Sequence, residues 1–176
     1  MKGTYKKVYI AMLIAIGLVL HIIESFIPIP ISLPGTKLGL ANIASLLTVA
    51  IYGPMTAFAV STVRAVLGGL LAGGVVSIPY SLNGAIFSTV VMWLALKYLS
   101  PHVSLIGVSI LGAGAHNFAQ ICTASIILQN VGIFTYLPVL LIIGTVTGYF
   151  IGLTGNYTIK TLSINVDKYR KDGGNF

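Results

Sequence analysis

The sequence predicts an all-α integral membrane protein, a bundle of six transmembrane helices with both termini in the cytoplasm. Of its 176 residues, 56% are hydrophobic and only 7% are charged, and the mean hydropathy is +0.98. Soluble domains carry about 25% charged residues, so a soluble fold would lack the polar surface that it needs. The only charged side chains between Val8 and Ile159 are Glu24, Lys37, Arg64 and Lys97. We expect one domain over residues 1–176, with 8–164 embedded in the membrane and 165–176 as a basic cytoplasmic tail.

Six apolar runs are each expected to form one span, and proline, glycine or polar residues separate them. Three prolines from Pro28 to Pro34 end the first run, and Gly53-Pro54 makes a tight turn after the second. A glycine-rich stretch over residues 68–74 is expected to loosen the end of the third run. The second run is short enough to be re-entrant instead, and the sixth is longer than the bilayer requires. The expected spans are residues 8–27, 38–52, 55–71, 78–99, 103–128 and 136–164.

The lysines and arginines support this topology independently. With the N-terminus inside, only Lys37 lies outside and Arg64 falls within the third span. The remaining cations all fall on the cytoplasmic side, as the positive-inside rule requires; they are Lys2, Lys6, Lys7, Lys97, Lys160, Lys168, Arg170 and Lys171. Membrane orientation therefore accounts for the net charge of +7 better than nucleic-acid binding does. We expect a multi-pass protein of the cell membrane, in a bacterial plasma membrane.

The chain lacks the residues that several kinds of chemistry require. Cys122 is the only cysteine, which excludes an internal disulfide and a cysteine-based metal site. The chain has no G-x-x-x-x-G-K-[ST] loop for ATP hydrolysis. Its only aspartates, Asp167 and Asp172, lie in the tail, so no carboxylate cluster can hold Mg²⁺ and a diphosphate. We expect a protein that is not an enzyme and that uses no cofactor or metal.

Small residues on the first span suggest a face for close helix packing. Ala11 and Ala15 are four residues apart, hence on one side of a helix, and Gly17 follows them. Small residues let another helix backbone approach closely within a membrane. The face either packs inside the bundle or docks a separate membrane subunit.

Lys37 and Asn42 lie where the second span is expected to begin. A helix N-terminus presents free N–H groups and the positive end of the helix dipole, and a lysine beside it would deepen that positive site. A carboxylate or phosphate would fit there, and Asn42, one turn further on, would hydrogen-bond the ligand. The alternative is that Lys37 extends its ammonium to the membrane interface.

Glu24 is expected near the outer end of the first span, and Arg64 near the middle of the third. A charge at membrane depth normally faces a partner, the bundle interior or a cavity. Glu24 and Arg64 are expected to pair directly or through water if their helices adjoin, with Lys37 competing for Glu24. Such a pair either fixes helix register or lines a binding site, with one partner freed when a ligand binds.

The fifth span carries His116, Asn117 and Gln120, whose spacing places them on neighbouring parts of one helix face. They offer several donors and acceptors in a nearly dry environment, which suits either a polar ligand or interhelical hydrogen bonds. Asn83, and Ser81 near it, are expected to face the same site from the fourth span. The remaining histidines, His21 and His102, lie near expected span ends and are expected to be solvated or packed.

Several of these motifs resemble a family usually described as heptaprenyl diphosphate synthase component I, also called Gx transporters. The resemblance covers about residues 8–155. It rests on Pro34–Asn42, Glu24, Arg64 before Leu67–Leu71, Ser81–Gly84, Gly112–Gln120 and Tyr136–Leu140. That family is similar in turn to the substrate-binding (S) components of energy-coupling factor (ECF) transporters, six-helix membrane proteins that bind vitamins or related micronutrients from outside.

The resemblance implies a function and a set of partners. Ala11 and Ala15 would dock on a transmembrane coupling subunit, and residues 28–37 would help to close over the substrate. Two separate ATPase subunits would drive the S component to topple and release its substrate inside. Substrate binding would fall to the polar residues described above, namely Glu24, Lys37, Asn42, Arg64, Asn83, His116, Asn117 and Gln120.

The substrate stays open at this point, since a quinone or isoprenoid precursor, a flavin and a thiamine-like molecule all fit. The enzyme in the family's description is expected to reflect its pathway context, because prenyl diphosphate synthesis depends on aspartate-rich motifs that this chain lacks. Two alternatives to an S component of an ATP-driven importer remain. One is a non-catalytic membrane partner of a heptaprenyl diphosphate synthase, and the other is a self-sufficient small transporter or channel.

Overall fold

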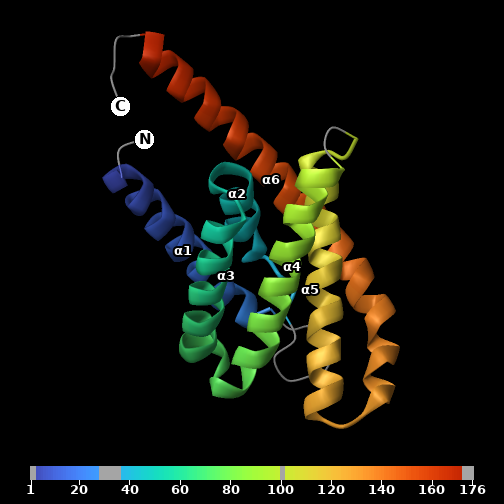
Figure 1. The fold of residues 1–176 in the computed structure, drawn as a ribbon. Coiled ribbons are helices and arrows are strands. Elements are labelled where there is room, and N and C mark those ends of the chain that lie inside the picture. The colour runs from blue at the N-terminus through green and yellow to red at the C-terminus, as the bar shows by residue number, and fades with distance from the viewer. Residues whose placement is uncertain (1–2, 28–36, 100–101, 172–176) are drawn as a thin grey trace.

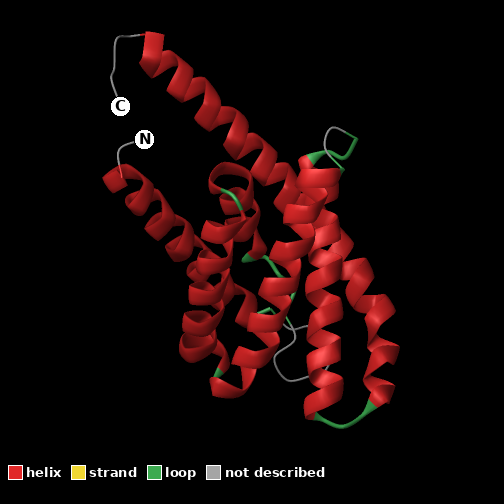
Figure 2. Cartoon of the chain, in the orientation of Figure 1, coloured by secondary structure: helices red, strands yellow, loops and turns green. Residues whose placement is uncertain are grey.

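The computed structural model describes residues 3–27, 37–99 and 102–171, with the backbone alone for residues 163–171. Within these ranges helices joined by loops make up the chain, and there is no strand, as Figure 2 shows. The α-helices are α1 (Gly3–Ser25), α2 (Asn42–Tyr52), α3 (Pro54–Gly68), α4 (Ile78–Tyr98), α5 (Leu105–Ile127) and α6 (Leu137–Lys171). Shorter helical turns are η1 (Gly69–Gly73), η2 (Val75–Ser77) and η3 (Val131–Tyr136). The all-α class and the six helices are therefore confirmed.

Five of the helices are long and apolar enough to cross a membrane, and α2 is the exception. Its 11 residues measure about 16 Å at 1.5 Å per residue, against about 30 Å of hydrocarbon. The prediction that the second helix begins at residue 38 is wrong, because residues 37–41 are not helical. Gly39 has a φ of +84°, outside the helical range, and its N–H group is bonded to the Glu24 carboxylate.

The turns predicted from glycine and proline are confirmed. Gly53 has a φ of +82°, and Pro54 follows it at the first position of α3, where a missing N–H group costs nothing. The glycine-rich stretch after α3 forms the wide turn η1, and Gly74, with a φ of +69°, ends it.

The helices run alternately up and down the bundle, and the start of α1 and the end of α6 lie at the same end (Figure 1). The long helices adjoin in the order α1, α3, α4, α5 and α6. The short helix α2 contacts all five of them and buries an almost unbroken run of side chains from Asn42 to Val49. A helix that cannot cross the membrane alone is therefore the centre of the bundle.

Glycines four residues apart bring α6 against α5. A Cβ atom at Gly148 would lie 2.9 Å from the Cα atom of Ile110, and one at Gly152 would lie 2.5 Å from the Cα atom of Ile106. Only glycine permits such an approach of two backbones, which is how membrane helices gain packing energy. The spacing of Gly144, Gly148 and Gly152 is visible in the sequence, but this packing was not predicted from it.

Candidate functional site

Polar side chains fill a layer of the bundle between two apolar layers. One apolar cluster consists of Leu46, Met92, Ala95, Val108 and Ile151, and the other of Tyr80, Ile121, Ala124, Ile133 and Leu140. On α5 the residues between the two clusters include His116, Asn117 and Gln120, each at most 3% exposed. Glu24, Lys37, Asn42 and Arg64 are also buried, and contacts described below join most of these side chains. We call Glu24, Lys37, Asn42, Arg64, His116 and Gln120, with His21, the polar cluster.

Four contacts fasten the segment before α2 to the surrounding helices. The Lys37 Nζ atom lies 2.6 Å from the His21 Nε2 atom on α1, and the Lys37 backbone N–H group donates to the Gln120 Oε1 atom on α5 at 3.4 Å. The Gly39 N–H group donates to the Glu24 carboxylate. The Thr147 hydroxyl on α6 donates to the Leu38 carbonyl at 3.2 Å. Residues 37–39 therefore connect α1, α5 and α6 in the middle of the protein.

Lys37 does not extend to the membrane interface, because its side chain is only 7% exposed and turns inward to His21. His21, expected to be solvated or packed, proves to be packed. A Cβ atom at Gly68 would lie 2.5 Å from the His21 ring, so this glycine makes room for the imidazole.

The expectation of free N–H groups at the start of the second helix is wrong. Helix α2 begins at Asn42 rather than beside Lys37. Its first N–H groups already donate to backbone carbonyls: Asn42 to Gly39 at 2.9 Å, Ile43 to Leu40 at 3.3 Å and Ala44 to Ala41 at 3.2 Å. An anion would therefore be held here by side chains rather than by the helix terminus.

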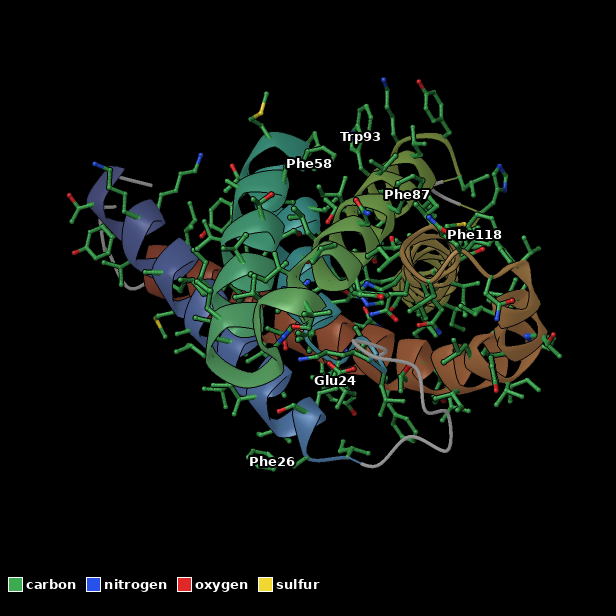
Figure 3. The ribbon with its side chains drawn as sticks, turned by 90° about the horizontal axis from the view of Figure 1, so that it is seen from below. Glu24, Phe26, Phe58, Phe87, Trp93 and Phe118 are labelled. Carbon is green, nitrogen blue, oxygen red and sulfur yellow. The ribbon has the colours of Figure 1, made fainter. Side chains whose placement is uncertain are left out.

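Glu24 and Arg64 both face the polar layer, but in the described part of the chain no salt bridge joins them. Figure 3 shows Glu24 turned toward the middle of the bundle, whereas Phe26 and Phe118 point outward. The guanidinium of Arg64 donates to the Asn42 Oδ1 atom at 3.3 Å, and its Nε atom has no hydrogen-bond partner. A charge at the centre of a membrane helix costs about 2.5–3.5 kcal/mol. Glu24 offsets this cost only through space, since in the described part of the chain no salt bridge reaches the guanidinium.

The three polar residues of α5 point to different neighbours. Gln120 accepts from Lys37, and Asn117 donates to the Leu140 carbonyl on α6 at 2.6 Å. The His116 ring lies against Gly84 on α4, since a Cβ atom there would be 2.8 Å from the Nδ1 atom. Neither ring nitrogen makes a hydrogen bond of good geometry. Asn117 thus acts partly as an interhelical bond, while His116 and Gln120 stay in the cluster.

Asn83 lies apart from the polar cluster. It is on the exposed side of α4 and donates to the Thr123 hydroxyl on α5 at 3.0 Å, so it connects these two helices. Ser81 is buried, and its hydroxyl is without a hydrogen-bond partner. Asn83 is thus a predicted binding residue that the structure places outside the polar cluster.

Two features of the site were not anticipated. The inward face of α1 is formed by Gly17, His21 and Glu24, whose spacing of four and three residues is typical of one helix face. A Cβ atom at Gly17 would lie 2.5 Å from the Arg64 Cδ atom, so this glycine makes room for the arginine stem. A chain of hydroxyls also joins α2, α3 and α4, with Ser45, Ser61 and Thr89 at successive separations of 2.7 and 2.8 Å.

Ala11 and Ala15 lie on the outer side of α1, where both are exposed together with Met12 and Ile16. They do not pack inside the bundle, so the first of the two predicted uses of this face does not apply. Residues 28–36, expected to help close over a substrate, lie outside the described residues. Within the described part of the chain, no group of three histidine, cysteine, aspartate or glutamate side chains could hold a metal ion.

A comparison with protein families gives one match. The family model described as Heptaprenyl diphosphate synthase component I matches residues 13–158, most of the chain. The matched segment runs from α1 into α6 and includes the whole polar cluster, and Ala15 but not Ala11. No curated protein and no solved structure matches the chain.

Proposed function

The chain belongs to the heptaprenyl diphosphate synthase component I family, and we propose that it is the membrane-embedded substrate-binding component of an ATP-driven importer. The proposed cargo is a vitamin or a related micronutrient precursor. The family membership confirms the resemblance predicted from the motifs. The five long apolar helices are those of a multi-pass membrane protein, for which we propose the bacterial plasma membrane.

The observation that supports substrate binding is the unfinished hydrogen bonding of the polar cluster. Buried polar groups in folded proteins are almost always paired, and each unpaired one costs about 1–3 kcal/mol. Here Asn42, Arg64, His116 and Gln120 each have a buried polar atom without a partner. A bundle meant only to be stable gains nothing from this arrangement, whereas a polar ligand would complete it.

The partners follow from what the chain presents outward and from what it lacks. The exposed side of α1 carries Ala11 and Ala15, small residues that let another helix backbone approach closely, and we assign it to a transmembrane coupling subunit. Because the sequence has no nucleotide-binding loop, ATP hydrolysis falls to two separate ATPase subunits. The shared end of α1 and α6 (Figure 1) would face the cytoplasm, in keeping with the lysines there.

The substrate-binding role is tested by asking whether the purified protein carries a small molecule. Native mass spectrometry of the protein released from detergent should show a bound mass, and the same compound should raise the melting temperature when added back. If neither the protein's own cargo nor any member of a broad panel of vitamins and quinone precursors raises that temperature, the role is wrong.

The docking role is tested by adding bulk to the exposed face of α1. The double variant Ala11→Leu, Ala15→Leu should lose assembly with the coupling subunit and lose uptake, yet keep the ligand-induced rise in melting temperature. Ala59→Leu is the control, because it adds a leucine at an exposed position of a different helix, α3. Uptake that persists in the double variant would refute the assignment.

The family's description favours a second candidate, a non-catalytic membrane partner of a heptaprenyl diphosphate synthase. Glu24 is the single carboxylate among the side chains that the structure describes, so the partner enzyme would supply the aspartates for Mg²⁺. This candidate predicts that a prenyl diphosphate synthase co-purifies with the protein and that no small molecule does. Finding the opposite pair of results would exclude it.

A further inference from the structure

The polar cluster has more free donors than free acceptors. Arg64 donates only, so Asn42 must turn its Oδ1 atom to the guanidinium, which leaves the Asn42 NH₂ group free. The Lys37 backbone N–H group likewise requires the Oε1 atom of Gln120 and leaves the Gln120 NH₂ group free. The Asn42 Nδ2, Arg64 Nε and Gln120 Nε2 atoms are all buried and all without partners. Their neighbours therefore fix both amide orientations, and both amides offer donors.

Compared with these three unpaired donors, the neighbouring buried side chains offer one unpaired acceptor. Asn117 gives its NH₂ group to the Leu140 carbonyl, so its Oδ1 atom is the free one. The ring of His116 can serve in either sense. A ligand that satisfies this set must present mainly acceptor atoms, with room for one donor.

The free donors lie around one short segment. The Asn42 Nδ2 atom is 2.9 Å, and the His116 Cδ2 atom 3.5 Å, from the point where a Cβ atom of Gly39 would stand. Gln120 holds the same segment at Lys37, and Arg64 is bonded to Asn42. Because Gly39 has no side chain, Asn42 and His116 can both come close to its backbone.

The charges of the cluster are also unequal. Lys37 and Arg64 are two cations, and Glu24 is the one acidic side chain beside them. The Glu24 carboxylate is bonded to the Gly39 N–H group, and Lys37 is bonded to His21. Neither cation forms a salt bridge among the described residues, so the cluster has one positive charge in excess, and Arg64 is the cation that also has an unpaired N–H group.

We propose that the cluster binds a small molecule with a single negative charge and further acceptor oxygens, the charge lying at Arg64 and the oxygens at the Asn42 and Gln120 amides. The proposal rests on the proposed substrate-binding function and narrows its substrate. A thiamine-like cation would add a third positive charge to a donor-rich site. A prenyl diphosphate brings more negative charge than one uncompensated cation can balance. A carboxylic acid with carbonyl or hydroxyl groups matches both the charge and the hydrogen-bond inventory.

The experiment compares small probes of different charge. The purified protein, freed of its cargo in lipid nanodiscs, is titrated with sets of small carboxylic acids, their carboxamides and the corresponding amines, and with inorganic pyrophosphate. The cargo released from the protein is classed by charge in mass spectrometry. We expect a monoanionic cargo, acids that bind at least about tenfold more tightly than their amides, and amines and pyrophosphate that do not compete.

Arg64→Met is the informative variant, because methionine keeps an unbranched stem beside Gly17 and removes the charge. It should weaken acid binding about 10- to 100-fold, the loss expected for a hydrogen bond to a charged group, and should leave amide binding nearly unchanged. Arg64→Lys should recover part of the acid preference. Lys97→Met is the control for net charge, since Lys97 lies over the Trp93 and Tyr98 rings at the end of α4.

The outcomes separate the two proposals. A cargo that is cationic, neutral or a diphosphate, or acid binding that survives in Arg64→Met, would overturn the ligand class and leave the capture function standing. A protein that carries no cargo and binds no probe of any charge would overturn both.

Discussion

Gly39 offers a way to damage the candidate site through one methyl group. The residue has a φ of +84°, and an added Cβ atom would lie 2.9 Å from the Asn42 Nδ2 atom. A Gly39→Ala change therefore strains the backbone and pushes on the Asn42 amide. Gly74 is the matched control, because its φ is +69° and a Cβ atom there would meet nothing within 4 Å. Both variants pay for a positive φ, and only Gly39→Ala disturbs the polar cluster.

The magnitudes follow from the two effects. A residue other than glycine held in such a backbone region costs about 1–3 kcal/mol, which is the whole expected loss of stability for Gly74→Ala. Moving the Asn42 amide breaks its hydrogen bond with the Arg64 guanidinium, and bonds to charged groups are worth about 1.5–3 kcal/mol. The Gly39→Ala protein should therefore be destabilised by about 2.5–6 kcal/mol.

The assay is thermal unfolding of both variants in the same detergent, with and without the small molecule recovered from the wild-type protein. Gly74→Ala should melt at a lower temperature but keep the full rise on adding the molecule. Gly39→Ala should melt lower still and show little rise. If both variants respond to the molecule as the wild type does, then Gly39, Asn42 and His116 do not form part of its site.

Two further predictions concern the packing that supports the site. A double-mutant cycle of His21→Leu and Lys37→Met should give a coupling energy of about 1–3 kcal/mol, because each side chain satisfies the other in a buried position; additive effects on the free energy of unfolding would contradict the 2.6 Å contact. Gly152→Ala should destabilise the protein by about 1–3 kcal/mol, since its Cβ atom would lie 2.5 Å from a backbone atom of α5. Gly114→Ala, whose Cβ atom would meet only Leu141 at 3.7 Å, should stay within about 0.5 kcal/mol of the wild type, and equal losses in the two variants would contradict the close approach of α5 and α6.

The helices were predictable because the sequence shows both the apolar runs that form them and the proline, glycine or polar residues that separate these runs. Gly53-Pro54 and the glycines from Gly68 to Gly74 mark turns that the structure contains. The start of α2 was not predictable in this way, because residues 38–41 are as apolar as the helix that follows. What keeps them from being helical is the conformation of Gly39 and its bond to Glu24, and that contact joins residues 15 positions apart.

For the candidate site, too, some features were predictable from the sequence and others were not. Rarity alone singled out Glu24, Lys37 and Arg64, since a charge in a membrane helix needs a reason. The contacts that these three side chains make depend on the rotation of each helix about its axis and on the depth in the bundle at which α2 begins. Hydropathy reveals neither. Glu24 therefore binds a backbone N–H group rather than Arg64, and Asn83 turns to Thr123 rather than to the cluster.

Other features were within reach of the sequence. The inward face of α1 and the glycines of α6 both have helical spacing, and either could have been found by searching for small and polar residues at intervals of three and four. Ala11 and Ala15, the small residues that were predicted as a packing face, lie on the opposite side of α1 from His21 and Glu24.

The most direct test of the central claim is an experimental structure of the protein purified together with the molecule that it carries. The account predicts that this molecule lies among Arg64, Asn42 and Gln120, with its charged group at the guanidinium and acceptor oxygens within hydrogen-bond distance of both amides. A molecule bound elsewhere, with these three donors still unpaired, would contradict it.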